Sequence, residues 1–466
     1  SPNIWIVLSL AMIMVAYYYN TQQINISTVV AVLFGTVWWS IYQSIHTLLP
    51  SSFHGVFTQG EWIIATTTMA IALMEYTRQL LLFTPQSNIL CYQTVAMSGL
   101  ISAVMTCPFM NYLEIAFHKY QTRYPRQNIV KKPMALPLWI QIPLWIGIPL
   151  VGVELLEFGP WRKEATTAMS LQESSSDLNL PDWIIPFTPK SILWLTQFLW
   201  ETEIPQVLSS SCWFPPILPR YYWVLYWMAV MVVTIPLSPK PNANSSKSIV
   251  LARKWFHGVA VLLFGPATVA APQLLSLSYA IALAILLIFE SARSSIPFIQ
   301  QFHERYLDPS KDDMNKVVIS HMALIAGCAV PLWITELLPN LEWRNRLVLQ
   351  LWGILCLGIG DAMGAVVGVH YGRTKWSRYN ARSVEGSAAM WWSSMVIIGL
   401  LLLLMTTNVS KDATTDFYSL FEQFHWPCVC AISFVTLLEA FTFQIDNLVL
   451  PLTGTALLLL LLPTSS

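Results

Sequence analysis

Charged side chains recur beside the apolar segments in the second half of the chain. They occur in six places, at 253–257, Glu290, Asp361, Glu385, Glu439 and Asp446. A charge at membrane depth costs free energy and is a functional candidate by default. Carboxylates next to cations are also the groups that hold divalent metals and phosphate oxygens. The pattern therefore indicates chemistry on phosphate groups.

The segment from Gly372 to Gly386 combines flexible backbone, cations and hydroxyl groups. Proteins bind phosphate through backbone N–H groups, Arg or Lys charge and hydroxyl donors. The candidate phosphate-binding residues are Gly372, Lys375, Arg378, Arg382, Ser383 and Gly386, joined by Arg253 and Lys254 from an earlier segment. The alternative is that these cations only anchor the loop on the cytoplasmic side of a membrane. No GxxxxGK[ST] motif or kinase glycine-rich loop occurs, so neither soluble class of nucleotide enzyme fits.

Glycines at 360, 364, 368 and 372 form a stripe directly before this loop. A spacing of four places them on one face of a helix, where the absence of side chains allows close helix–helix packing. Packing is the simpler explanation of the stripe. Its position beside the cationic loop favours a second role in the same site.

Three carboxylates are candidate metal ligands: Asp361, Glu385 and Asp446. Mg²⁺ is held by one or two carboxylates together with phosphate oxygens, so these residues suffice without a dedicated cage. Glu439 and Asp446 are seven residues apart, which predicts two turns of one helix with both on the same face. A structural ion pair is the alternative for any single carboxylate.

The composition excludes a soluble globular protein. Of the 466 residues, 55% are hydrophobic and 11% charged, against about 45–50% and about 25% in soluble chains. Apolar runs near the length a bilayer requires predict an all-α, polytopic bundle of about 13–14 transmembrane spans. The formal net charge is zero, which gives no support for a nucleic-acid partner. The seven cysteines are best explained as small buried apolar residues.

The chain divides into two regions of different character. Residues 1–240 are predicted to be an N-terminal multi-span membrane region of unclear role. A Pro-, Asn- and Ser-rich linker at 236–248 leads into a C-terminal multi-span module, residues 241–466, with seven apolar segments. Those segments lie near 255–270, 275–293, 317–338, 347–370, 388–407, 426–442 and 448–463.

Loop charge predicts the orientation of the second region. The loops at 238–254, 294–316 and 372–386 contain eleven Lys and Arg residues, and the alternate loops contain three. Lys and Arg are retained on the cytoplasmic side, so the 372–386 loop is predicted to face the cytosol. Asn408, in an Asn-Val-Ser glycosylation sequon, then lies on the luminal side.

At this point the residues resemble the dolichol kinases of the polyprenol kinase family. The resemblance lies in Gly360-Asp361, Gly368, Gly372, Lys375-Trp376 and Glu385-Gly386, with Arg253-Lys254-x-Phe256-His257 before them and 437–448 after them. It covers about 250–466, with four separated motifs in the family's order. Where the family usually has Lys-Thr-x-Glu-Gly, this chain reads Arg382-Ser383-Val384-Glu385-Gly386. Cation and hydroxyl are kept, although Arg and Lys are not equivalent at a phosphate.

The resemblance implies a CTP-dependent enzyme of the endoplasmic reticulum membrane with an active site facing the cytosol. Its acceptor is the terminal hydroxyl of dolichol or another polyprenol, and its cofactor is Mg²⁺ or another divalent cation. Asp361 and Glu385 are then expected at Mg²⁺–CTP, with Asp446 as third ligand or base. His257 is expected either to take the proton of the acceptor hydroxyl or to be a core histidine bonded to Glu290.

Two other functions use similar residues. A membrane cytidylyltransferase would join CMP to a lipid phosphate and release pyrophosphate, and the 253–257 and 445–447 segments favour the kinase over it. A transporter predicts polar residues near the midplane of inverted repeats, whereas the charges here gather toward one side. The sequence gives neither the oligomeric state nor the length of the acceptor chain.

Overall fold

A computed structural model describes nine long continuous parts of the chain and some further residues. They are 138–158, 190–203, 218–239, 246–292, 320–336, 341–377, 382–406, 413–442 and 446–462, with scattered residues between 93 and 116 and residue 338. Every regular element within these parts is a helix, and extended backbone pairs only in bridges joining Thr202 to Pro219 and Lys375 to Ser383. The predicted all-α class is confirmed.

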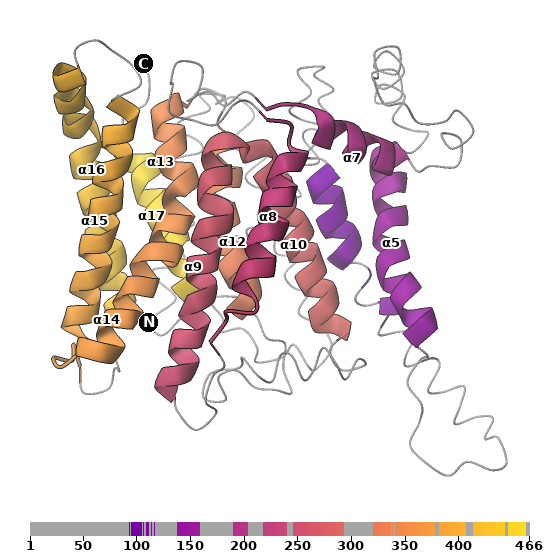
Figure 1. Cartoon of the computed structure of the whole chain (residues 1–466), viewed down its shortest axis with the longest axis horizontal. Helices are drawn as coiled ribbons and strands as arrows, with labels where there is room; N and C mark the ends of the chain where they lie inside the picture. The colour runs from indigo at the N-terminus through magenta and orange to yellow at the C-terminus, as the bar shows by residue number, and fades with distance from the viewer. Residues whose placement is uncertain are drawn as a thin grey trace, which may run out of the picture.

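Most of the helices stand side by side with their axes roughly parallel, and α7 lies across one end of them (Figure 1). They are α5 (Leu138–Phe158), α7 (Lys190–Trp200), α8 (Tyr221–Thr234), α9 (Ser246–Ala270), α10 (Pro272–Ala292), α12 (Ser320–Glu336), α13 (Trp343–Gly353), η4 (Ile354–Asp361), α14 (Ala362–Tyr371), α15 (Val384–Thr406), α16 (Ala413–Phe441) and α17 (Asp446–Leu461). Pro272–Glu290, Trp343–Tyr371 and Val384–Leu403 are long and apolar enough to cross a membrane. Six shorter apolar helices accompany them in the described residues. The chain is a multi-pass helical membrane protein, and the total of 13–14 spans remains a prediction.

All seven apolar segments predicted after the linker coincide with helices. One detail of that prediction is wrong. A single helix was expected through Glu439 and Asp446, but α16 ends at Phe441 and α17 begins at Asp446. The two carboxylates therefore belong to different helices.

One long helix runs from Trp343 to Tyr371 and contains a π-helical segment, η4, in its middle. Gly358 and Gly360 lie in this segment, and Asp361 is its last residue. The widened turn packs against α9 and α15. From Asp361 to the end of the helix at Tyr371 the distance is about 15 Å, since each helical residue rises about 1.5 Å. Asp361 is thus held deep within the bundle, where it is buried.

Glycines in the core allow neighbouring helices to pack closely. The indole of Trp352 is fully buried and covers Gly454 of α17, where a methyl group would collide with the ring. Gly353 likewise approaches the backbone of Gly327 in α12. Lipid is as apolar as these side chains, so close packing rather than the hydrophobic effect drives such contacts in a membrane.

The predicted glycine stripe packs against the start of α15. A Cβ added at Gly364 would lie 3.2 Å from the carbonyl oxygen of Gly386. One added at Gly386 would lie 2.7 Å from the carbonyl oxygen of Gly364. Helix–helix packing, the simpler explanation of the stripe, is therefore correct.

This packing predicts opposite effects for two glycines of α15. Gly386→Ala places a methyl group against backbone that moves only with its helix, which costs about 1–3 kcal/mol of stability. A Cβ at Gly399 meets nothing within 4 Å, so Gly399→Ala leaves stability equal or slightly higher through better helix propensity. Thermal unfolding in detergent checks the pair. Equal melting temperatures for the two variants would contradict the packing described.

Candidate functional site

Lys254, His257 and Asp361 meet between α9 and η4. The Lys254 ammonium forms an ion pair with Oδ2 of Asp361, and Nδ1 of His257 lies 3.6 Å from the same oxygen. The Asp361 and His257 side chains are only 7% and 6% exposed. Because a buried carboxylate is strongly destabilised without a partner, this pairing is what allows Asp361 to occupy its position.

The His257 ring is oriented by a backbone carbonyl. Its Nδ1 lies 2.8 Å from the carbonyl oxygen of Leu357, in the π-helical segment. A carbonyl oxygen only accepts hydrogen bonds, so Nδ1 is the donor and Nε2 of a neutral ring is the acceptor. The ring thus contacts Leu357 and Asp361, and not Glu290, the partner that the core-histidine alternative predicted.

Arg382 joins the ends of two helices. Its guanidinium lies 3.0 Å from Oε1 of Glu439 and 2.5 Å from Oδ2 of Asp446. All three side chains are largely buried, with exposures of 16–23%. The planar fork of arginine suits two carboxylates at once. Arg382, just before α15, therefore holds Glu439 near the end of α16 and Asp446 at the start of α17.

The two groups form one electrostatic network. The charge of Asp361 interacts with those of Arg382 and Glu439, and the charge of Lys254 also interacts with that of Glu439. Burial by itself would lower the pKa of Arg382, but Asp446 and then Glu439 more than offset this, so its pKa lies above the usual value. Arg382 therefore stays charged at any physiological pH. The network brings together three carboxyl groups and two cations.

The loop between α14 and α15 closes on itself as a small hairpin. Val384 N–H donates to the carbonyl of Thr374 at 2.9 Å, and Trp376 N–H donates to that of Arg382 at 3.3 Å. Ser383 caps α15, since its Oγ accepts the N–H of Gly386 at 3.2 Å. These bonds fix the backbone that carries Arg382.

Trp376 ties the hairpin to the neighbouring helices. Its indole N–H donates to Oγ of Ser387 at 2.9 Å, and its ring meets Phe441 of α16 edge-on at 5.5 Å between centroids. In the sequence, Trp376 stands out only as part of the Lys375-Trp376 motif. The sequence feature that could have indicated its role in attaching the hairpin to α15 and α16 is an indole N–H next to a cationic loop.

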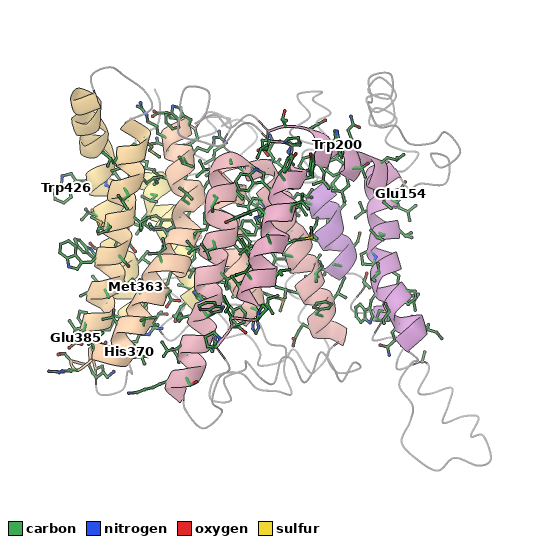
Figure 2. The ribbon with its side chains drawn as sticks, in the orientation of Figure 1. Glu154, Trp200, Met363, His370, Glu385 and Trp426 are labelled. Carbon is green, nitrogen blue, oxygen red and sulfur yellow. The ribbon has the colours of Figure 1, made fainter. Side chains whose placement is uncertain are left out.

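Glu385, a predicted metal ligand, is half-buried at the lower end of α15, near His370 (Figure 2). Its two carboxylate oxygens lie 2.9 and 3.2 Å from the backbone nitrogen of Thr374 and accept its N–H. This contact holds the hairpin. Neither the Lys254 group nor the Arg382 group includes Glu385 among the contacts described.

The other predicted phosphate-binding residues lie around the same end of the bundle. Gly372, Ser383 and Gly386 pack against one another where α14 meets α15. Lys375 pairs with Ser383 through the hairpin backbone and exposes its side chain. Arg253 is half-buried and acts electrostatically on His257. Arg378 lies outside the described residues.

A divalent cation is the cofactor that the sequence predicted. Among the residues described, no three His, Cys, Asp or Glu side chains gather as a ready-made metal site. Mg²⁺ requires only one or two carboxylates when phosphate oxygens complete its shell. Oδ1 of Asp446 is buried and accepts no hydrogen bond in the described structure. This oxygen, beside Glu439, fits such a partial site.

Glu439 is the residue of the network that the site prediction omitted. It had been recognised as a deep charge but received no role, because its partner Arg382 lies far away in sequence. Its position near the end of an apolar helix was the available signal.

The fold and the network together define a multi-pass helical membrane protein with a buried charged site beside a cationic loop. Comparison with curated proteins finds dolichol kinases. The chain is 29% identical over 288 residues to dolichol kinase EVAN of Arabidopsis thaliana, covering 60% of this chain and 46% of that protein. It is 28% identical over 285 residues to dolichol kinase of Mus musculus, covering 58% and 48%. The chain is related to the dolichol kinases, which confirms the resemblance predicted from its motifs.

The match is partial in length. The chain spans about half the length of these two curated relatives. Dolichol kinase sec59 of Schizosaccharomyces pombe is 30% identical over 183 residues, covering 36% of this chain and 35% of that protein. No family model matches the chain. No solved structure matches it either.

Variants of the buried ion pair are expected to show that its effect on stability and its effect on activity are distinct. Lys254→Met leaves Asp361 buried without its cation, which costs about 3–5 kcal/mol of stability. Adding Asp361→Asn removes the uncompensated charge and restores much of that loss. Thermal unfolding of the two single variants and the double variant measures this recovery.

If the pair also belongs to a catalytic site, the double variant remains inactive while its stability recovers. Recovery of activity together with stability would show that the pair serves structure alone. Failure of the double variant to regain stability would contradict the pairing itself.

Proposed function

We propose that this chain is a dolichol kinase that uses CTP. It transfers the γ-phosphate of CTP to the terminal hydroxyl of dolichol or another polyprenol, giving dolichyl phosphate and CDP. The observation that carries the proposal is the buried group of Lys254, His257 and Asp361, set among apolar helices beside the cationic hairpin. The relatives named dolichol kinase support phosphorylation of dolichol, and the CTP donor is part of the proposal.

The position of the group suits two substrates from different phases. Dolichol is apolar except for one hydroxyl, so its chain stays in lipid while the hydroxyl lies near the headgroups. CTP is highly charged and comes from water. The charged network extends from buried Asp361 to Arg382 and Asp446, beside the hairpin that carries exposed Lys375, so it lies between the region of each substrate. We place this end of the bundle at the cytosolic face of the endoplasmic reticulum membrane, following the loop charges.

The reaction needs a base and a means of holding phosphate. With Nδ1 bonded to Leu357, His257 offers Nε2 to take the proton of the acceptor hydroxyl. The hydroxyl oxygen then bonds to the γ-phosphorus as the bond to the β–γ bridging oxygen breaks, and the electron pair leaves with CDP. Asp361, 3.6 Å from Nδ1 of the ring, stabilises the positive charge of the imidazole as the proton arrives, and Lys254 fixes the position of Asp361.

Charge neutralisation is the other requirement of phosphoryl transfer. Lys375, Arg378 and Arg253 supply cations to the phosphates, and Arg382 keeps the carboxylates beside them in place. Asp446, with Asp361 or Glu439, would hold Mg²⁺, which would supply neutralisation of the negative charge that phosphoryl transfer develops. Glu385 supports this arrangement through the hairpin backbone.

The direct test uses purified protein, dolichol and radiolabelled CTP, ATP or GTP. The expected products are dolichyl phosphate and CDP, with CTP the preferred donor. Asp361→Asn is expected to lose at least about 100-fold of the turnover, as for other residues that act in the transition state. Release of pyrophosphate with formation of a CDP-lipid would replace this proposal by a cytidylyltransferase.

Two cations of the hairpin are expected to respond differently to removal. Lys375→Ala removes an exposed cation and lowers kcat/KM for CTP about 10- to 100-fold, the value of one charge-assisted hydrogen bond, without changing stability. Arg382→Ala causes a similar kinetic loss and also lowers the melting temperature, because Glu439 and Asp446 lose their shared partner. Kinetics and thermal unfolding of both variants give the comparison. Unchanged CTP kinetics in Lys375→Ala would remove the hairpin from the nucleotide site.

A further inference from the structure

Helix α9, which carries Lys254 and His257, contains a proline at 266. Proline has no backbone N–H, so the carbonyl of Leu262, four residues earlier, loses its donor within the helix. Leu262 and Pro266 both face outward from the bundle. In a membrane protein that face meets lipid, which cannot supply a hydrogen bond.

The missing donor comes from α8. The Tyr226 hydroxyl donates to the Leu262 carbonyl at 2.6 Å. The Trp227 indole N–H donates to the next carbonyl, that of Leu263, at 2.8 Å. Two consecutive residues of α8 therefore donate to consecutive carbonyls of α9, and the first of these is the carbonyl that Pro266 deprives of its helical donor.

Helix α8 is itself fixed in place. Arg220, directly before it, is 5% exposed and donates to the carbonyl of Phe198 at 2.9 Å and to Glu201 at 3.1 Å. It also donates to Glu203 at 3.2 Å and to the side-chain oxygen of Gln273 at 2.7 Å. Gln273 lies at the start of α10, just beyond α9. The N-terminal end of α8 is thus connected through Arg220 and Gln273 to the start of α10, which directly follows α9.

Any bend of α9 at Pro266 would act on the site at a distance. Lys254 is roughly 18 Å and His257 roughly 14 Å along the helix from residue 266, at 1.5 Å per residue. A change of about 10° in the bend would move Lys254 by about 3 Å at this rise per residue. Misplacement by about 1 Å is enough to cost about 100-fold in rate.

We propose that α8 belongs to the catalytic unit and that Tyr226 and Trp227 are positioning residues. They hold α9 at the angle that brings Lys254 and His257 to Asp361. This gives part of the region before residue 240 a role in the reaction. The inference rests on the proposed kinase activity, but the contact on which it depends is testable without it.

The test compares Tyr226→Phe with Tyr222→Phe, each in the native and the Pro266→Ala background. Tyr222 is an exposed tyrosine of the same helix that stacks on Tyr221, and its variant is the matched control. Tyr226→Phe is expected to lower the melting temperature by about 2–4 °C or more, the cost of one orphaned carbonyl. It should lower kcat about tenfold or more with KM for CTP unchanged, because geometry and not nucleotide binding is disturbed. In Pro266→Ala, residue 266 regains its N–H, and Tyr226→Phe should have little further effect on the melting temperature.

Each outcome is decisive. A kcat for Tyr226→Phe equal to that of Tyr222→Phe would overturn the positioning role while leaving the proposed reaction intact. An equal loss of melting temperature in both backgrounds would show that the hydroxyl does not replace the proline's missing donor, and would also overturn it. Absence of activity in the unaltered protein would overturn the proposed function, and the melting temperatures would still decide whether α8 holds α9.

Discussion

The ion pair between Lys254 and Asp361 is the interaction on which the arrangement of the bundle depends. A carboxylate about 15 Å from the end of a long apolar helix persists only with a cation beside it. That requirement places α9 against the π-helical segment and brings His257 to the carbonyl of Leu357. Arg382 meets the same requirement for Glu439 and Asp446, and so joins α15, α16 and α17. The need to pair each buried charge thus determines which helices pack next to each other.

A second constraint is that each carbonyl freed by a proline needs a neighbour. Pro331 frees the carbonyl of Gly327 in α12, and Gly353 approaches that carbonyl. Pro451 frees the carbonyl of Asn447 in α17, and Gly327 approaches it in turn. Weak Cα–H···O contacts and close packing are what glycine allows at such places. Pro266, Pro331 and Pro451 are therefore points at which one helix is attached to another.

Most of the later helices and most of the charged site were predictable from the sequence. The features that were not predictable were missed for physical reasons. Apolar length placed the seven later helices, and the cost of buried charge identified Lys254, Asp361, Glu439 and Asp446 as a group. The pairing of Arg382 with Glu439 is a tertiary contact without local signal. The seven-residue spacing alone predicted one helix through 439–446, because no residue type in that stretch indicates the end of a helix. The same limit applies to Glu385, whose chemistry suits a metal and a backbone N–H equally.

The π-helical segment also sets the phase between the two halves of the longest helix. Each residue added to or removed from an α-helix turns everything beyond it by about 100°. A relative one residue shorter between 354 and 361 would keep its hydrophobicity and its glycine spacing, yet Asp361 and the glycine row would face away from Lys254 and α15. The number of residues in this segment, more than their identity, keeps the carboxylate and the glycine row in register. An alignment of such chains should therefore treat a single gap here as a change of function.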